Sequence, residues 1–282
     1  MYFPPAFDVA RSTELAFLVT QAYDQLEACL KGVPWDLQGG YSLVRQLVQE
    51  TGPARDRTQY RSDLRVFRGS AAERNRAYPI GFVAQKGSES FIAFRGTTTV
   101  SEWIRNLNVR LSGYVLGGFG RVHEGFLETY VSMRKALLEA VGRLNPRNRL
   151  FVTGHSLGAA LATLALPDIA AATPFARPVM YTYGSPRVGD NQFCTAFNGT
   201  CGKDSFRIVN TSDIVVSLPL PAPVFGVIGG YFSHVEKPVD FTVQANDLER
   251  NHSMETYRSA LISARKGMWS LRRVLGRGGS AS

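Results

Sequence analysis

Long hydrophobic runs and cysteine pairs are both scarce in this sequence. No stretch of about 18 consecutive apolar residues occurs along the chain, which argues against a membrane-spanning helix. The three cysteines, Cys29, Cys194 and Cys201, cannot all pair, and they lack the spacing of a metal site. Reduced thiols are the simpler interpretation, and a bridge between Cys194 and Cys201 is the alternative.

Repeats, long linkers and a leader sequence are also missing. With 282 residues and 44% hydrophobic side chains, the chain is long enough for one well-buried domain, and we expect residues 1–282 to form it. Residues 1–5 (Met-Tyr-Phe-Pro-Pro) have neither the basic start nor the apolar core of a signal peptide. A cytoplasmic protein, or a secreted form that has already been processed, is therefore expected.

The most informative feature present is a serine between two glycines, in the run 153–160 (Thr-Gly-His-Ser-Leu-Gly-Ala-Ala). An apolar, β-branched segment precedes this run and an alanine-rich helical segment follows it. Such a sharp strand-to-helix turn presents a serine hydroxyl to a histidine base, so Ser156 is the predicted nucleophile. The free N–H group of Leu157, at the start of the helix, is predicted to face the oxyanion. Without this context the motif would be equally typical of an ordinary β–α loop.

The base must come from one of only four histidines. In doubly wound α/β folds the order is serine, acid, histidine, which leaves His234 and His252. His234 lies in the alternating segment 231–235, predicted as a strand, where a structural role is favoured. His252 follows a polar run and precedes a helix-like segment, so it is the predicted base. His155, next to the nucleophile, is predicted to pack or hydrogen-bond rather than to react.

The acid is predicted to be Asp213, because it follows the strand-like segment 205–210 and begins a loop. Its carboxylate would fix the imidazole tautomer and stabilise the imidazolium. Asp190 is the second candidate, but its position before 191–194 favours helix capping. Asp247 could share a loop with His252 and ranks third.

A second oxyanion donor and a lid are predicted upstream. Segments 80–84 and 91–94 predict a β-hairpin that leads into the loop at Thr97, whose backbone N–H would complement that of Leu157. The next segment, 100–107, carries apolar residues at helical spacing: Val100, Trp103, Ile104 and Leu107. We interpret it as an amphipathic lid that opens at a lipid surface; a helix fixed on the core is the alternative.

Several ordered motifs together resemble the class 3, or fungal-type, lipases. These motifs are 94–97, 122–126, 153–160, 183–190, 210–213 and 251–252. The resemblance implies a single-domain α/β-hydrolase fold, with a central, mostly parallel sheet and a short helical lid. It also implies a Ser156, Asp213 and His252 triad, with an oxyanion hole from Thr97 and Leu157. It places a catalytic core at 75–262, between an N-terminal helical segment, 1–74, and a basic tail, 263–282.

The predicted function is hydrolysis of carboxylic esters, with triacylglycerol at an oil–water interface as the expected substrate. A phospholipase, a soluble carboxylesterase and an inactive lipase-like binding module are the alternatives. This chemistry requires no metal and no organic cofactor. The net charge of +9 comes partly from the tail, which could bind anionic membranes as an amphipathic helix, although a solvated helix is favoured. No motif for nucleic acid accompanies this charge, and the sequence does not indicate an oligomeric state.

The apolar, proline-rich segment 218–225 predicts a stiff loop between the acid and the base. It could line an acyl groove or serve only as buried structure. The helical spacing of apolar residues in 12–30 predicts a helix that packs across the sheet.

Overall fold

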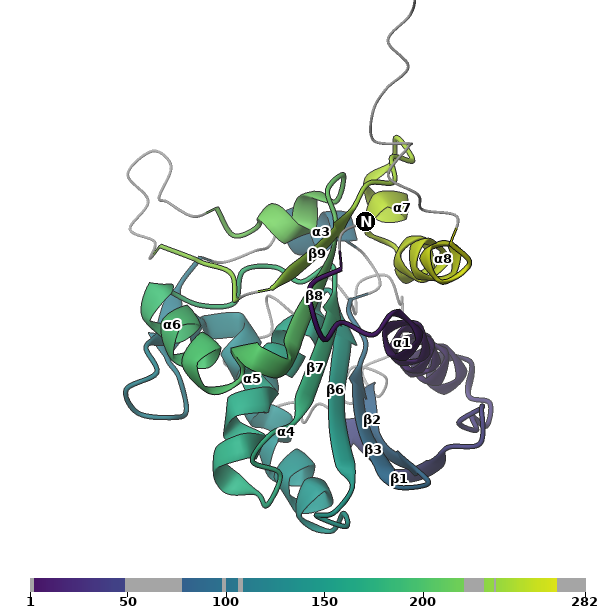
Figure 1. The fold of residues 1–282 in the computed structure, drawn as a ribbon, viewed down its shortest axis with the longest axis vertical. Helices are drawn as coiled ribbons and strands as arrows, with labels where there is room; N and C mark the ends of the chain where they lie inside the picture. Colours follow the sequence, from purple (N-terminus) through teal and green to yellow (C-terminus); the bar gives the residue numbers. More distant parts are fainter. Residues whose placement is uncertain are drawn as a thin grey trace, which may run out of the picture.

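A computed structural model describes residues 3–48, 78–97, 100–105, 109–220, 231–235 and 237–267. Within these ranges a seven-stranded sheet forms the centre of the molecule (Figure 1). Its strands, in spatial order, are β1 (Ser42–Val48), β2 (Pro79–Lys86), β3 (Glu89–Phe94), β6 (Arg149–His155), β7 (Val179–Tyr183), β8 (Ser205–Asn210) and β9 (Pro238–Phe241). Strands β1, β2 and β3 pair antiparallel, and β3, β6, β7, β8 and β9 pair parallel.

Burial explains why the central strands form from nearly continuous apolar runs. Every residue of β7 and β8 is buried, as is all but the first residue of β3 and of β6. Parallel strands covered on both faces carry this pattern, whereas strands with one exposed face alternate. The edge strand β9 alternates between exposed and buried residues, and most of β1 is exposed.

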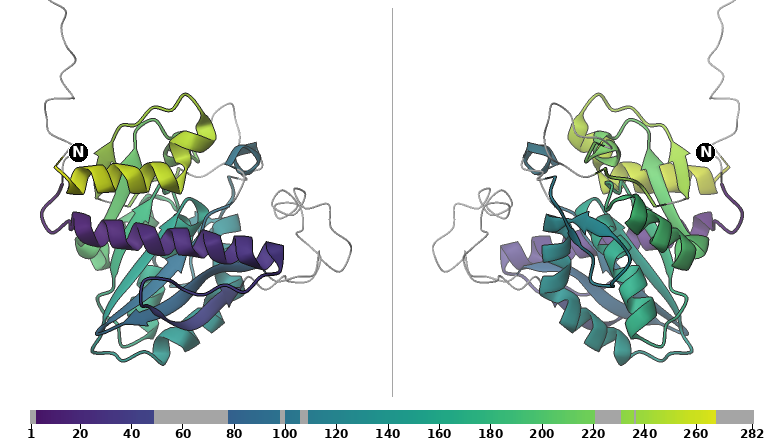
Figure 2. Two further views of the ribbon diagram at one scale, coloured as in Figure 1. Left: turned by 90° about the vertical axis from the view of Figure 1, so that its right-hand side faces the viewer. Right: turned by 90° about the vertical axis from the view of Figure 1, so that its left-hand side faces the viewer.

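Helices cover both faces of the sheet, as the side views in Figure 2 illustrate. Helices α1 (Val9–Lys31) and α8 (Met254–Arg265) lie against each other on one face and bury one apolar cluster. The opposite face is covered by α4 (Glu124–Gly142), α5 (Leu157–Ala172) and α6 (Asn191–Thr200), around a second apolar cluster. The remaining described elements are α3 (Val100–Arg105), β4 (Leu111–Gly113), β5 (Arg121–His123), the 3-10 turns η3 (Gly202–Asp204) and η4 (Ile214–Ser217), and α7 (Leu248–His252).

Helix α5 is apolar on nearly all sides because it is enclosed between the sheet and α4. Its one buried charge, Asp168, accepts hydrogen bonds from Tyr130 Oη at 2.5 Å and from Arg134 Nε at 2.6 Å. Arg134 Nη2 donates to the second carboxylate oxygen at 2.8 Å, which makes the ion pair bidentate. This pairing fixes α5 against α4 and so holds the turn that precedes α5.

Most of the predicted elements are present in the described residues. The segment 80–94 forms the hairpin β2–β3, and 12–30 lies within α1. Two expectations are wrong. The segment 231–235 is not a strand, since only Ser233 bridges to Gly189. The segment 1–74 is not purely helical, because β1 joins the sheet beside β2.

Further expectations concern the thiols, membrane-spanning helices, the basic tail and the proline-rich segment. Cys29, Cys194 and Cys201 are free, and burial raises the pKa of the Cys194 thiol to about 12. In the described ranges, no helix has the length and apolarity needed to cross a bilayer. Most of the tail, 268–282, and the apolar segment 221–225 lie outside the described residues.

Candidate active site

The turn between β6 and α5 holds Ser156 in a backbone conformation that side chains rarely adopt, with φ 57° and ψ −124°. Conformations of this kind cost of order 1–3 kcal/mol and are retained where the surrounding structure over-determines them. Here the Ser156 N–H donates to Tyr183 O at 3.0 Å, and the side chain is buried. The turn therefore fixes the direction of the Ser156 Cα–Cβ bond.

The two glycines beside the serine are required by close backbone contacts. A Cβ at Gly154 would lie 2.1 Å from Gly158 O, and one at Gly158 would lie 2.5 Å from Arg95 O. The strand, the helix and the loop after β3 can approach one another only because neither residue has a side chain. The predicted turn geometry is therefore present.

The predicted acid and base are in contact. His252 Nδ1 donates to Asp213 Oδ2 at 2.6 Å, and both side chains are almost completely buried. Asp213 precedes η4, and His252 is the last residue of α7, so the base belongs to a short helix rather than to the loop expected. With Nδ1 donating to the carboxylate, Nε2 is the ring nitrogen left to act as a proton acceptor.

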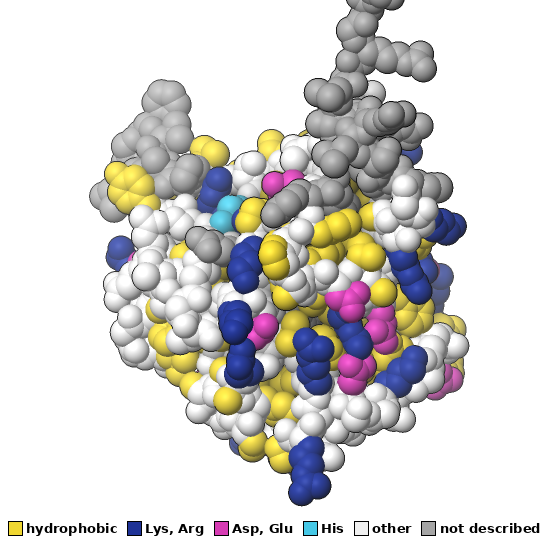
Figure 3. Space-filling view, in the orientation of Figure 1, with side chains coloured by type: hydrophobic (Ala, Val, Ile, Leu, Met, Phe, Trp, Pro, Cys, Tyr) yellow, Lys and Arg dark blue, Asp and Glu magenta, His cyan; other side chains and the backbone are white. Residues whose placement is uncertain are grey.

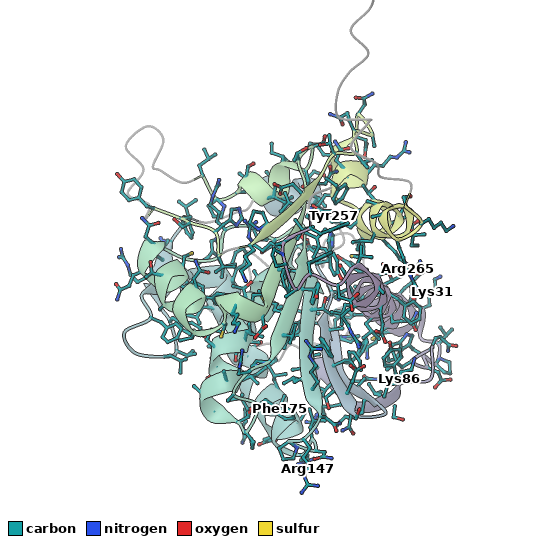
Figure 4. The ribbon with its side chains drawn as sticks, viewed as in Figure 1. Lys31, Lys86, Arg147, Phe175, Tyr257 and Arg265 are labelled. Atoms are coloured by element: carbon teal, nitrogen blue, oxygen red, sulfur yellow. The ribbon has the colours of Figure 1, made fainter. Side chains whose placement is uncertain are left out.

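Two more donors hold the Asp213 carboxylate. The Val215 N–H donates to Oδ1 at 2.9 Å, and Tyr257 Oη donates to Oδ2 at 2.7 Å. Burial, and then the charge of Asp213, raise the pKa of Tyr257 well above its usual value, so this phenol remains a donor. Figure 4 marks Tyr257, which comes from α8. No role for Tyr257 was predicted from the sequence.

Ser156 and His252 lie on adjoining segments, although they are not hydrogen-bonded to each other. Among the described residues His252 Nε2 is buried and has no hydrogen-bond partner. Gly184 follows the strand that holds the Ser156 N–H, and a Cβ on it would lie 3.0 Å from His252 Cε1. In unliganded sites catalytic hydrogen bonds are commonly long and tighten when substrate binds.

The loop after β3 lies against the serine. A Cβ at Gly96 would lie 2.7 Å from Ser156 Cβ, so Thr97 follows a residue in van der Waals contact with the nucleophile. Arg95 Nη1 donates to Gly96 O at 2.7 Å, and Arg95 Nε donates to Pro79 O at 2.8 Å. Because Gly96 C=O and Thr97 N–H belong to one planar peptide, Arg95 fixes the direction of that N–H.

Two further groups, one in the serine turn and one in the loop after β3, are hydrogen-bond donors suited to stabilise a negatively charged oxygen. Leu157 is the first residue of α5, where backbone N–H groups have no partner within the helix. Thr97 Oγ1 is buried and has no hydrogen-bond partner among the described residues. Buried orphan donors are rare in proteins and call for an explanation.

The alternative acids have structural roles. Asp190 caps α6 by accepting from Phe193 N at 2.9 Å, as expected for a helix cap. Asp247 caps α7 by accepting from Arg250 N at 2.7 Å. Both carboxylates stabilise helix starts, where backbone donors and the helix dipole favour negative charge.

The other candidate histidines also form structural hydrogen bonds. His234 Nε2 donates to Val216 O at 2.7 Å. His155 Nε2 donates to the backbone oxygen of His252 at 2.7 Å, and its Nδ1 lies 2.7 Å from Tyr23 Oη. These contacts agree with the predicted absence of direct chemistry at either ring.

His234 predicts a pH dependence of stability. Burial, and then the positive charge of Arg207, lower its pKa to about 3, against about 6.5 in an unfolded chain. The unfolded state therefore binds a proton that the folded state excludes, and stability falls as pH decreases from about 6.5 toward 3. The slope for one proton is about 1.4 kcal/mol per pH unit.

We expect His234→Gln, which keeps a donor toward Val216 and does not titrate, to reduce this slope by up to one proton. Urea unfolding between pH 4 and pH 7 measures the slope for both proteins. Parallel stability curves would contradict the assignment.

The predicted lid is described only in part. Helix α3 spans Val100–Arg105, with Val100 buried and Ile104 packed against the core. Ser101 Oγ donates to Glu249 Oε1 at 2.5 Å, which ties α3 to α7, the helix that ends at His252. Nothing is described of the Trp103 side chain, and Leu107 lies outside the described residues.

The sheet, the serine turn between β6 and α5, and the paired Asp213 and His252 after β8 and β9 form an arrangement typical of α/β hydrolases. Residues 91–222 match the sequence model of the class 3 lipases.

Two curated relatives match more than half of this chain. The chain is 36% identical over 181 residues to phospholipase A1-II 3 of Oryza sativa subsp. japonica, which covers 53% of this chain and 43% of the relative. It is 34% identical over 178 residues to a lipase of Rhizomucor miehei, covering 59% of this chain and 48% of the relative. The chain thus spans less than half the length of these two curated relatives.

Solved structures support the fold. The Rhizomucor miehei lipase propeptide complex superposes with a TM-score of 0.61 at 24% identity, over 85% of this chain and 70% of that chain. A triacylglycerol lipase whose catalytic centre is described as a serine protease triad superposes with a TM-score of 0.60 at 24% identity, over 85% and 83% of the two chains.

Proposed function

We propose that this protein is a serine hydrolase that cleaves the carboxylic esters of acylglycerols through an acyl-enzyme. The observation that carries the proposal is the buried hydrogen bond of 2.6 Å between His252 and Asp213, beside the strained turn at Ser156. Buried carboxylate–imidazole pairs next to a serine on such a turn are typical of acyl-transfer enzymes.

Ser156 Oγ attacks the ester carbonyl carbon while His252 Nε2 accepts the hydroxyl proton. Asp213 holds the Nδ1 proton in place and stabilises the imidazolium that forms. The tetrahedral intermediate collapses when His252 gives its proton to the departing alcohol, leaving an acyl group on Ser156. Water then attacks the carbonyl carbon of this ester while His252 Nε2 accepts its proton. The second tetrahedral intermediate collapses when His252 returns that proton to Ser156 Oγ, which releases the fatty acid and restores the serine.

The backbone N–H groups of Thr97 and Leu157 are the proposed donors to the oxyanion, and Thr97 Oγ1 is a further one. Loss of one such donor typically lowers kcat about a hundred- to a thousand-fold. The fixed Gly96–Thr97 peptide supports this assignment, because preorganised donors need no rearrangement during the reaction.

Apolar side chains beside the site favour a lipid substrate. Ile214 and Leu248 are 46% and 47% exposed, and they belong to the elements that follow Asp213 and lead to His252. A phospholipase is the second candidate, because phospholipase A1-II 3 is among the relatives at 36% identity. A soluble carboxylesterase and an inactive binding module remain alternatives.

Positive charge is not gathered into one patch on the face drawn in Figure 3. The protein carries a net charge of +9, yet on the face drawn in Figure 3 lysine and arginine side chains are scattered among hydrophobic and acidic ones. Contact with anionic lipid through the basic tail remains part of the proposal. Release of the protein from anionic vesicles when residues after Lys266 are removed would support it.

Labelling and substrate series test the proposed function. A fluorophosphonate probe should label the protein, and Ser156→Ala should abolish the labelling. The protein should then hydrolyse emulsified triacylglycerol faster than phosphatidylcholine vesicles or short soluble esters. Preference for the vesicles would favour the phospholipase, preference for soluble esters would favour the carboxylesterase, and absence of labelling would overturn the proposal.

We further propose that α3 is a lid. Ser101→Ala removes a hydrogen bond between α3 and α7, a change of about 1 kcal/mol. The open fraction, and with it the rate on monomeric short-chain ester, should therefore rise by up to about fivefold. In the wild type, activity should increase abruptly as the ester passes from monomer to emulsion.

The matched control is Ser259→Ala, which removes a similar exposed bond to Glu255 within α8. It should leave both rates unchanged. Equal rates in wild type and Ser101→Ala, together with no increase at the emulsion, would exclude a lid at α3.

A further inference from the structure

A chain of hydrogen bonds links the loop after β3 to the segment that carries the proposed base. The Gly96 N–H donates to Tyr23 Oη at 2.9 Å, and Tyr23 Oη lies 2.7 Å from His155 Nδ1. His155 Nε2 lies 2.7 Å from the backbone oxygen of His252. The chain thus joins the segment before Thr97, helix α1, the residue before Ser156, and the end of α7.

Chemistry assigns a single direction to these bonds. The His252 carbonyl can only accept, so His155 carries its proton on Nε2. The neutral ring then has an acceptor at Nδ1, to which Tyr23 donates its hydroxyl proton. The Tyr23 oxygen, in turn, accepts from Gly96. Each group donates to the next, an arrangement in which hydrogen bonds strengthen one another.

The His155 ring is suited to remain neutral. It is 3% exposed and lies under the His252 ring, with the ring centroids 4.6 Å apart. Burial, and then the neighbouring His252, lower the pKa of His155 well below its usual value. A protonated ring would present a donor to Tyr23 and break the chain, so burial preserves it.

The ends of the chain are the groups whose separation matters for the proposed reaction. Gly96 precedes the Thr97 amide, and its carbonyl is already held by Arg95. The hydrogen bond to Tyr23 fixes the N–H of Gly96, and the hydrogen bond from His155 fixes the backbone carbonyl of His252. Among the residues that form this chain of hydrogen bonds, Tyr23 of α1 is the one that lies outside the sequence motifs around the site.

We propose that Tyr23 and His155 are positioning residues, which set the spacing between the Thr97 oxyanion donor and the His252 base through this chain. The inference rests on the proposed function. Neither side chain touches the reacting atoms. Their loss should lower kcat and leave KM nearly unchanged, because the spacing matters most in the transition state.

The first test is Tyr23→Phe, which removes the hydroxyl and keeps the ring. Displacements below 1 Å at such sites cost up to about a hundredfold, so we expect kcat on a soluble ester to fall about tenfold. The matched control is Tyr114→Phe, which also removes one buried tyrosine hydroxyl, bonded to Leu164 O at 2.5 Å on the opposite face of the sheet. The control should lose stability and retain kcat.

Two substitutions of His155 each keep one of its two hydrogen bonds and remove the other. Gln places an amide near the position of Nε2 and can still donate to the His252 carbonyl. Asn places its amide near Nδ1 and can still accept from Tyr23. Each should lower kcat, and Tyr23→Phe combined with His155→Gln should lower it no further than the worse single variant, because both break the same chain.

Histidine ¹⁵N spectra provide a readout that needs no activity. In the wild type His155 should be neutral and protonated on Nε2, and Tyr23→Phe should shift the Nδ1 resonance. The chain is absent if His155 is protonated on Nδ1. If these spectra are as expected but the wild type neither labels nor hydrolyses, the proposed function fails and the positioning role fails with it.

The remaining outcome separates the two claims. If the wild type hydrolyses esters through Ser156 while Tyr23→Phe keeps kcat within about twofold and behaves like Tyr114→Phe, the proposed function stands and the positioning role is overturned.

Discussion

Ser156→Gly should abolish ester hydrolysis and at the same time yield a more stable protein than Ser156→Ala. Both changes remove the nucleophile, and loss of such a serine typically lowers kcat by about 10⁶. They differ in the backbone, since φ of 57° with ψ of −124° strains any residue with a Cβ but not glycine. Relief of about 1–3 kcal/mol exceeds the entropic penalty of glycine, about 0.5–1 kcal/mol.

The difference is measured by urea unfolding of both variants under identical conditions. We expect the Gly variant to be more stable by about 1 kcal/mol, the remainder of those two effects. Equal stability would mean that the turn is not strained, and a Ser156→Ala variant that kept kcat within about tenfold of the wild type would exclude Ser156 as the nucleophile.

Asp213→Asn should lower kcat about 10⁴-fold, the loss known for this change in other serine triads. The wild-type carboxylate accepts from Val215 N, Tyr257 Oη and His252 Nδ1. An amide offers one oxygen and one NH₂ group, so at least one of these donors faces another donor. If the NH₂ group faces His252, Nδ1 must become an acceptor and the ring proton moves to Nε2. The protonated Nε2 can no longer accept the hydroxyl proton of Ser156.

Asp190→Asn is the matched control, because Asn caps helices about as well as Asp. Its kcat should equal that of the wild type, and steady-state kinetics on a soluble ester measure both variants. If Asp213→Asn retained kcat while Asp190→Asn lost it, the acid would be misassigned.

Residues with strong local signals could be predicted from the sequence. The glycines around Ser156 and the position of Asp213 after an apolar strand both follow from short-range patterns. The buried strands β6 and β8 were predicted for the same reason.

Features that depend on distant partners could not be predicted. Strand β1 is mostly exposed and forms by pairing with β2. Its apolar residues, Leu43, Val44, Leu47 and Val48, do not alternate with polar ones, so the sequence lacks the pattern of a half-buried strand. Tyr257 and Tyr23 resemble ordinary aromatic residues of amphipathic helices, and their hydroxyl partners lie far along the chain. Chemistry that depends on the packing of α1 and α8 across the sheet has no local pattern.

The order of strands has a consequence for a chain that is still being synthesised. Ser156 follows β6, whereas His252 follows the edge strand β9, which pairs only with β8 among the described strands. About a hundred residues separate the two, so at usual elongation rates the serine exists for roughly 5–20 s before the histidine is made. A nascent polypeptide on the ribosome therefore carries the proposed nucleophile without the proposed base, and under the proposed mechanism it cannot cleave ester bonds of nearby lipids until α7 has emerged.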